Sequence, residues 1–269
     1  MRTSTLYSLM LILIAVLCIV LSRIIDLSPP RTGERTNTAA TNALTAPDDT
    51  PRIAIVIDDC GAQRTYEERY LALSPDIVFA VLPEGAYASR FAGTLAQRGY
   101  EYIVHMPMEP HDENEVRGMH YLTVSNDAKA VKISLEKAFT AVRGARGMNN
   151  HTGSRFTEEK TSLVAVADFC RERGVYFLDS RTSIKSAAYD VMRDMHIPAA
   201  KRDIFLDDTR TVRAIRERFN ALIARAKRQG SAIAIGHYTS EMTLAVLAEE
   251  LPRLTEHGVR LVRLSELVQ

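Results

Sequence analysis

The sequence lacks the residues and motifs that mark several protein classes. Its 269 residues contain no tryptophan and only three cysteines, Cys18, Cys60 and Cys170. None of them forms a Cys-x-x-Cys pair, which excludes a disulfide framework and a cysteine-ligated structural zinc site. The glycine-rich motifs GxGxxG and GxxxxGK[ST] are also absent, so the sequence gives no support to a nucleotide cofactor.

An excess of charge of either sign is also missing. The chain has 34 Lys and Arg against 33 Asp and Glu, a formal net charge of +1. This balance supplies no long-range field for binding polyanions, so nucleic acid is not an expected partner. Hydrophobic residues make up 46% of the chain and charged residues 25%. These fractions are typical of globular proteins and exclude a disordered, collagenous or multi-span membrane chain.

One long apolar run is present, at the N-terminus. Residues 6–25 carry a single charge, Arg23, and a helix of this length, rising ~1.5 Å per residue, would cover about 30 Å and cross a bilayer. We predict that residues 1–27 form an uncleaved membrane anchor. A cleaved signal peptide is the alternative, although no small-x-small cleavage sequence follows the run. The positive-inside rule, applied to the arginines that follow, would keep the rest of the chain cytoplasmic.

A composition change separates this segment from the rest of the chain. Residues 28–50 are rich in Thr, Ala, Asn and Pro and have almost no large apolar side chains. They cannot bury enough surface to offset the entropy lost on ordering, so we predict a flexible linker. Residues 51–269 then form a single domain of a size usual for a β/α barrel.

Short apolar runs recur through this domain, with helical periodicity between them. Runs without polar alternation are typical of strands buried on both faces, as in parallel sheets. They lie at residues 53–57, 77–82, 102–105, 175–178, 203–206, 232–236 and 259–264. The alternation predicts an α/β fold with seven or eight mostly parallel strands, closed or nearly closed into a barrel. A doubly wound open sheet is the alternative.

Polar side chains follow the C-terminal ends of these strands. In parallel β/α folds the loops at that edge converge on the active-site face. The set includes carboxylates and imidazoles, which bind divalent metals such as zinc, and together they favour a metal or acid–base site. The residues are Asp58, Asp59, His105, Asn149, Asn150, His151, Asp179, Arg181, Asp207 and His237.

Single members of this set also have structural interpretations. Asp58 or Asp59 would cap a helix near residues 62–73 if they bind no metal. His105 or His237 would be a buried core histidine with its hydrogen bonds satisfied.

Two neighbouring features have similar alternatives. Cys60 is expected to be a small buried residue, with a reactive thiol or metal ligand as the alternative. Asp179 and Arg181 would either take part in the site or fix the loop that carries them.

An ordered series of sequence blocks narrows the choice: IAIVIDDCG, FAVLP, HMPMEP, GMNNHTGS, FLDSRT, RDIFLD and AIGHYTSEMTL. The series resembles the divergent polysaccharide deacetylase family, the YibQ-like branch of the NodB-type carbohydrate esterases, over roughly residues 51–269. The resemblance implies a distorted β/α barrel and a carbohydrate or peptidoglycan-type substrate. It also implies a cell-envelope location, with a periplasmic domain that is anchored in the inner membrane or free after cleavage.

The resemblance also implies roles for individual residues. By position, Asp58 would be the general base, Asp59 a metal ligand and His237 the general acid. The superfamily's usual pair of histidines, about four residues apart on one loop, is absent. We therefore expect His105 and His151, from different strands, to complete a site for a divalent metal, with zinc favoured.

The remaining polar residues would act around that centre. Asn149 and Asn150 would donate hydrogen bonds to an oxyanion or to sugar hydroxyls, and Asp179 and Arg181 would bind substrate or support the site.

Three functions stay open from the sequence. The first is metal-dependent deacetylation of an N-acylated sugar. The second is a catalytically silent envelope domain that binds glycan or a protein partner. The third, a metal hydrolase acting on another bond such as a phosphoester, is disfavoured by the absence of a basic phosphate-binding cluster.

Overall fold

The structure, a computed structural model, describes residues 49–269. The predicted anchor, residues 1–27, and all but the last two residues of the predicted linker lie outside the described residues. Within the described part of the chain, no helix combines the length and apolar character needed to cross a membrane.

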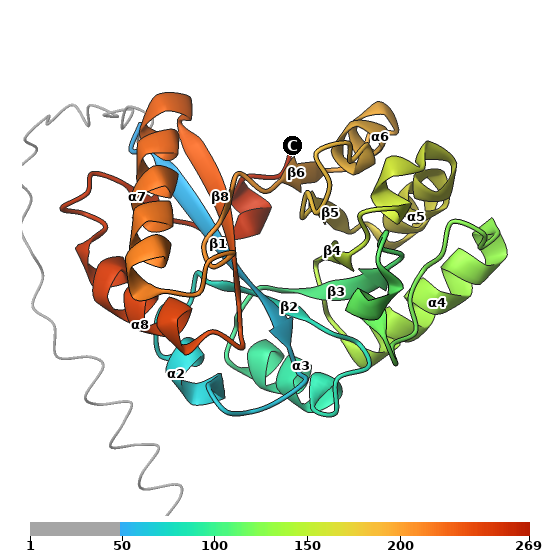
Figure 1. Ribbon diagram of the computed structural model, residues 1–269, viewed down its shortest axis with the longest axis horizontal. Coiled ribbons are helices and arrows are strands. Elements are labelled where there is room, and N and C mark those ends of the chain that lie inside the picture. Colours follow the sequence, from blue (N-terminus) through green and yellow to red (C-terminus); the bar gives the residue numbers. More distant parts are fainter. Residues whose placement is uncertain (1–48) are drawn as a thin grey trace, which may run out of the picture. The chain divides into compact units, whose positions relative to one another are not determined.

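A parallel sheet forms the centre of the molecule (Figure 1). Its order is β6-β5-β4-β3-β2-β1-β8-β7, with β9 paired to β1, and every pairing is parallel. The sheet curves into a half-barrel, which confirms the predicted α/β fold and distorted barrel. The strands are β1 (Arg52–Cys60), β2 (Val78–Val81), β3 (Tyr102–Met108), β4 (Gly147–Thr152), β5 (Tyr176–Asp179), β6 (Ala199–Lys201), β7 (Ile204–Phe205), β8 (Ser231–His237) and β9 (Arg260–Leu261).

The barrel is open along one line. β6 pairs with β5, and β7 pairs with β8. The sheet path therefore ends at β6 on one side and at β7 on the other. Only residues 202 and 203 separate these two strands in the chain. We call this boundary the seam.

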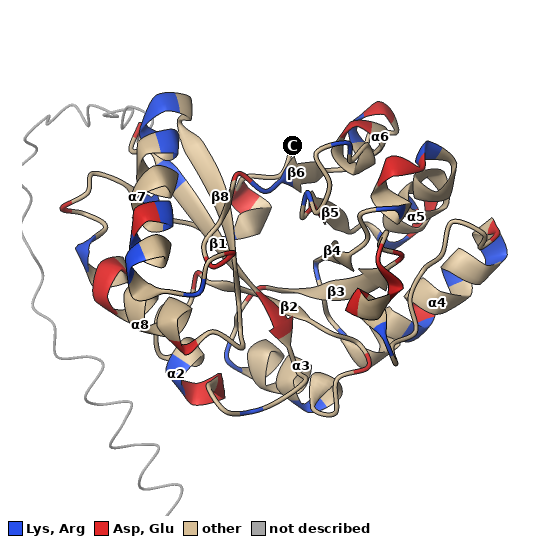
Figure 2. Cartoon of the chain, viewed as in Figure 1, with Lys and Arg blue, Asp and Glu red and all other residues tan. Residues whose placement is uncertain are grey.

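Helices cover the outer face of the sheet (Figure 1). Figure 2 shows that they carry basic and acidic residues intermixed. The α-helices are α2 (Glu67–Leu71), α3 (Ala88–Gln97), α4 (Ala128–Ala141), α5 (Lys160–Arg173), α6 (Ala188–Asp194), α7 (Val212–Gln229) and α8 (Glu241–Glu250). Short 3-10 helices are η1 (Glu113–Val116), η2 (Phe156–Glu158), η3 (Leu251–Arg253) and η4 (Leu264–Glu266).

Helix α7 illustrates how the sequence specifies these elements. Its buried residues, such as Ile215, Phe219 and Leu222, recur every three or four positions and line one face. The Thr211 side chain accepts a hydrogen bond from the N–H of Ala214 at the N-terminus. Gly230 ends the helix with φ +81°, a left-handed conformation that suits glycine. The helix therefore has one buried face and a defined start and end.

Side chains of the strands alternate between two buried clusters. Along β1, Ile53, Ile55 and Ile57 belong to the large cluster beneath the helices. Ala54 and Val56 belong to a smaller cluster inside the barrel. This period of two follows from strand geometry, and it decides which residues at the strand ends face the barrel interior.

Two glycines allow the loops after β1 and β2 to touch. The Tyr87 N–H donates to the Gly61 carbonyl across this contact, at 2.8 Å. Gly61 has φ +86°, and a Cβ there would lie 2.9 Å from Val81 Cγ1. A Cβ on Gly85 would lie 2.5 Å from the Gly61 carbonyl oxygen. Because the Gly61 loop directly follows Asp59 and Cys60, its position affects the end of β1.

We predict that Gly85→Ala destabilises the domain by about 1–3 kcal/mol, because backbone atoms must move to admit the methyl group. Gly93→Ala is the matched control: Gly93 lies exposed in α3 with no atom near its absent Cβ, and alanine there should stabilise by roughly 0.5–1 kcal/mol. Chemical denaturation measures both values. Equal stability of Gly85→Ala and the wild type would show that the loops are not in this contact.

Candidate active site

The strand alternation carries polar residues to the inside of the barrel at its C-terminal rim. On β1 the interior series Ala54, Val56 continues to Asp58, and on β3 Ile103 is followed two residues later by His105. On β8, Ile233 and Ile235 lead in the same way to His237. On each strand the interior residues just before the rim are apolar, and the residue that reaches the rim is polar. The sheet therefore brings these residues together, as the sequence predicts.

Asp59 breaks the alternation. The pairing of β1 with β2 shifts register between Ile57 and Cys60. Asp59 itself has φ +62°, in the left-handed region where residues other than glycine are uncommon. Such a bulge redirects side chains, and both Asp58 and Asp59 approach His105. A strained backbone that keeps two acids at one point is typical of functional sites.

Asp59, His105 and His151 form a tight cluster. Asp59 Oδ1 lies 3.3 Å from His105 Nε2 and 3.1 Å from His151 Nδ1. The two imidazole nitrogens are 3.0 Å apart, and one ligand atom from each residue lies within 4.8 Å of the others. The three residues come from three different strands, as predicted: Asp59 and His151 lie next to the last residues of β1 and β4, whereas β3 continues for three residues beyond His105.

The chemistry of this cluster fits a cation. Asp59 Oδ1 is buried and has no hydrogen-bond partner in the described part of the chain. A buried carboxylate oxygen without a donor is unfavourable unless a positive group faces it. His105 Nδ1 is 2.8 Å from Asn149 Oδ1, so it carries the proton and leaves a lone pair on Nε2 toward Asp59. The residues present therefore suit a divalent metal ion.

Burial and the two imidazoles determine the charges of the acids. Burial favours the neutral form of Asp59, but the adjacent imidazoles of His105 and His151, when protonated, lower its pKa well below its usual range. Burial raises the pKa of Asp58, and the nearby His105 and His237 only partly oppose that rise. Asp59 thus stays ionised, whereas Asp58 is the acid with the raised proton affinity.

Asn149 connects Asp58 with His105. Its Nδ2 donates to Asp58 Oδ1 at 2.9 Å and to Ser180 Oγ at 3.1 Å. Its Oδ1 faces His105, and the residue is fully buried. Asn149 therefore orients both a proposed base and a proposed ligand. Its predicted contact with substrate stays a prediction.

Asn150 and Asp179 bind the loop after β5. Asn150 Oδ1 accepts from the Ser180 N–H at 2.9 Å, and its Nδ2 donates to the Thr152 carbonyl at 2.6 Å. Asp179 accepts from the Arg181 N–H and from Ser186 Oγ, both at 2.8 Å. Of the two predicted roles for Asp179, the structure displays the loop-fixing one.

His237 is held by Asp207. The His237 Nδ1 lies 2.7 Å from Asp207 Oδ1, and its backbone N–H donates to Oδ2 at 2.8 Å. Thr243 Oγ1 donates to the same Oδ2. Burial lowers the pKa of His237, but the hydrogen bond and charge of Asp207 raise it to about 9. The imidazole is therefore protonated at neutral pH and lies beside Asp58, its register partner on β1.

Asp207 is among the residues predicted at this rim, but the sequence alone assigns it no role. The sequence gives one indication that Asp207 belongs to the site: it directly follows an apolar run, as other rim residues do. Nothing in the spacing connects it with His237, thirty residues later in the chain. The contact depends on the pairing of β7 with β8.

The structure decides whether Asp58 or Asp59 caps a helix and whether Cys60 is a packing residue. Helix α2 begins at Glu67, its N-cap is Tyr66, and no side chain caps it, so the capping interpretation of Asp58 and Asp59 is wrong. Cys60 is buried and free, with Sγ directed to the Ile57 carbonyl. Burial raises the pKa of its thiol well above the ordinary value, which agrees with a packing residue and not a reactive thiol.

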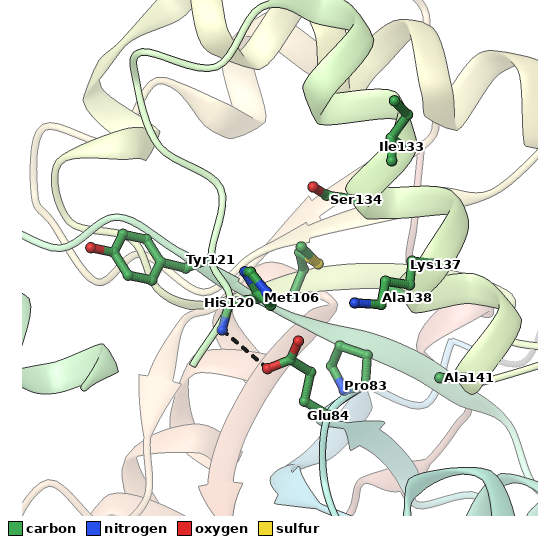
Figure 3. A pocket seen from close by; sticks show the side chains of 10 residues that line it. All are labelled: Pro83, Glu84, Met106, His120, Tyr121, Ile133, Ser134, Lys137, Ala138 and Ala141. Atoms are coloured by element: carbon green, nitrogen blue, oxygen red, sulfur yellow. Dashed lines mark hydrogen bonds between the residues drawn. The ribbon is translucent and has the colours of Figure 1, made fainter. Parts of the chain in front are cut away.

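A separate cavity of about 310 Å³ lies on the opposite face of β3 (Figure 3). Met106, which belongs to the outer cluster, lines it together with Ile133 and Lys137 of α4. The His120 N–H donates to Glu84 Oε2 at its edge. None of the residues predicted to act in catalysis or metal binding lines this cavity. It is distinct from the rim cluster.

The chain is similar to known proteins in sequence. Residues 55–268 match the family model described as divergent polysaccharide deacetylase. YibQ, an uncharacterized protein of Escherichia coli strain K12, is 33% identical over 230 residues, covering 86% of this chain and 71% of that protein.

Two solved structures share the fold. The uncharacterized protein ATU2773 of Agrobacterium tumefaciens has a TM-score of 0.77 and 22% identity, covering 89% of this chain and 92% of that one. The catalytic domain of a peptidoglycan N-acetylglucosamine deacetylase from Eubacterium rectale has a TM-score of 0.53 and 12% identity, covering 88% and 94%.

The family match spans nearly all of the described residues, and the relative at 33% identity is aligned over most of its own length. The resemblance inferred from the sequence blocks is confirmed: the chain belongs to the divergent polysaccharide deacetylase family.

Proposed function

We propose that this protein is a metal-dependent hydrolase of the cell envelope that removes an N-acetyl or related acyl group from a carbohydrate. The observation that carries the proposal is the convergence at one rim of the cluster Asp59, His105 and His151 with Asp58 and His237. A family of carbohydrate deacetylases supports the substrate class.

Asp59, His105 and His151 would hold the metal ion. Two imidazoles and one carboxylate match the ligands that zinc prefers, and three protein ligands leave a position open, as catalytic zinc sites require. A divalent ion bound there would act as a Lewis acid toward the acyl group. Asn149 keeps the His105 ring in the orientation and tautomer that this role needs.

Asp58 and His237 would carry the proton transfers. The raised pKa of Asp58 gives its carboxylate a greater affinity for the proton of the attacking water. The protonated His237 would then donate to the departing amine, with Asp207 keeping the ring in place. One group accepts a proton and the other gives one, and the β1–β8 pairing sets them side by side.

We further propose that residues 1–27 anchor the domain in the inner membrane, with the domain in the periplasm and accessible to a peptidoglycan-type substrate and to envelope protein partners. The apolar run at residues 6–25 supports this proposal. A reporter fused to residues 1–50 should stay in the membrane fraction through carbonate extraction. Recovery of a shortened, soluble reporter would show a cleaved signal peptide instead.

Substitution should separate metal binding from proton transfer. Asp59→Ala, His105→Ala and His151→Ala should each lower the metal content strongly, because each removes one of three ligands. Asp58→Asn and His237→Ala serve as the matched controls: they should keep the metal and lose turnover by about 10²–10⁴-fold. Elemental analysis and acetate release from an N-acetylated chito-oligosaccharide measure the two properties.

The opposite pattern would refute these assignments. Full metal content in the ligand variants would place the ion elsewhere. Wild-type protein that binds no divalent metal and releases no acetate would favour the silent glycan- or protein-binding domain.

The pH dependence follows from the raised pKa of His237. Only the protonated imidazole donates, so kcat/KM should fall as the pH rises through about 9. In Asp207→Asn the burial that lowers the pKa of His237 remains and the charge that raises it is gone. The alkaline limb should therefore move to lower pH, as pH–rate profiles of both proteins would measure. An unmoved limb would show that His237 is not the acid.

A further inference from the structure

The seam lies between two groups of residues that support the proposed site. Asn149 and Ser180, which support Asp58, lie on the β4–β5 side, whereas His237 lies on β8. Within the sheet, β6 pairs with β5 and β7 pairs with β8. Residues 202 and 203 join the two sides through backbone hydrogen bonds, from the Arg202 N–H to the Asp179 carbonyl and from the Asp203 N–H to the Ile233 carbonyl, both at 2.9 Å. These bonds hold the strands but not the rings at the rim, which a side chain of the connection can orient directly.

Arg202 is that side chain. It lies in the two-residue connection between β6 and β7. Its Nε donates to the Ser180 carbonyl at 2.6 Å, and its Nη2 donates to the Arg181 carbonyl at 2.9 Å. Two hydrogen bonds to consecutive carbonyls fix the plane of the guanidinium. Ser180 in turn accepts from Asn149, which donates to Asp58.

The same guanidinium packs on the other half of the site. Its Cζ lies 3.7 Å from the centroid of the Phe205 ring, a close cation–π contact. Phe205 also contacts His237: the two rings are stacked, with centroids 5.7 Å apart and an interplanar angle of 23°. Asp207 holds the His237 Nδ1. The imidazole is thus constrained by a hydrogen bond in its plane and by an aromatic ring against its face.

We propose that Arg202 and Phe205 are positioning residues that fix the orientation of the His237 imidazole, whose backbone the β1–β8 pairing already places beside Asp58. Arg202 orients Phe205, and Phe205 prevents the imidazole from turning about its side-chain bonds. This leaves Nε2, the nitrogen not held by Asp207, in a fixed direction. The catalytic consequence rests on the proposed function, whereas the structural coupling does not.

Arginine is specific for this arrangement. A lysine at position 202 keeps the positive charge but has no planar group to stack on a ring while donating to two carbonyls. A leucine at position 205 keeps apolar volume and removes the flat face. Both substitutions therefore test geometry while leaving charge or burial in place.

Arg225 offers the matched control. It pairs with Asp203 of the same connection at 2.7 Å, and the other carboxylate oxygen of Asp203 accepts from the Ile233 N–H near the start of β8. Arg225→Met removes an ion pair from the seam without touching Phe205 or His237. An equal loss of activity in Arg202→Lys, Phe205→Leu and Arg225→Met would reflect the stability of the seam alone.

The kinetic test uses the full chain with its metal. We expect Arg202→Lys and Phe205→Leu to lower kcat by about 10-fold to 100-fold through misplacement of the acid, with KM and metal content nearly unchanged. Phe205→Tyr, which keeps the ring, should retain activity, and Arg225→Met should behave as the wild type. Equal losses in Arg202→Lys and Arg225→Met, or a loss confined to KM, would overturn the positioning role.

A spectroscopic test separates this role from the proposed function. The chain has seven histidines, and in histidine-labelled protein the His237 ring signals are assigned by their absence in His237→Gln. Arg202→Lys and Phe205→Leu should shift these signals, and Arg225→Met should not. Unshifted signals overturn the inference even if activity falls. If these two variants shift the His237 signals and the wild type releases no acetate, the coupling is supported and the deacetylase proposal is rejected. If Arg202→Lys does not fold, Phe205→Leu decides the matter.

Discussion

The carboxylate of Asp59 is the group on which the arrangement of the rim depends. Its Oδ1 is buried with no hydrogen-bond donor among the described residues, its backbone is left-handed, and two imidazole nitrogens face it within 3.3 Å. The unpartnered oxygen and the left-handed backbone are unfavourable in a protein that needs the residue only for folding. A cation at this point would neutralise the carboxylate and engage both imidazole nitrogens.

The surrounding residues divide into two supports that meet at Asp58. On one side Asn149 binds Asp58 and His105 together, so the proposed base and a proposed ligand share one partner. On the other side Asp207 and Phe205 hold His237, the neighbour of Asp58 across the β1–β8 pairing. At the open seam, backbone hydrogen bonds of Arg202 and Asp203 join the two sides, and the Arg202 side chain adds hydrogen bonds to the Ser180 and Arg181 carbonyls.

Much of this fold is predictable from the sequence because the signals are local. Buried strands such as residues 53–57 are continuous apolar runs, and the polar residue after each run marks the rim of a parallel sheet. The same reasoning brings Asp59, His105 and His151 to one place. No pair of histidines on a single loop is needed for this prediction, because parallel strands bring residues near their C-terminal ends to the same edge of the sheet.

No local sequence pattern predicts the remaining features. β6 and β7 have three and two residues, too few to show any periodicity, so the seam between them is invisible in the sequence. The left-handed conformation of Asp59 is imposed by the β1 bulge and not by a glycine. Asn149 and Arg202 act through partners on other strands, and only the completed sheet defines those partners.

The most direct test of the metal assignment is an anomalous difference map from crystals of the wild-type protein, recorded at the absorption edge of the bound metal. The account predicts one strong peak at the rim, about 2.0–2.2 Å from Asp59 Oδ1, His105 Nε2 and His151 Nδ1. No peak at this cluster in crystals soaked in excess zinc, or a peak coordinated by other residues, would contradict it.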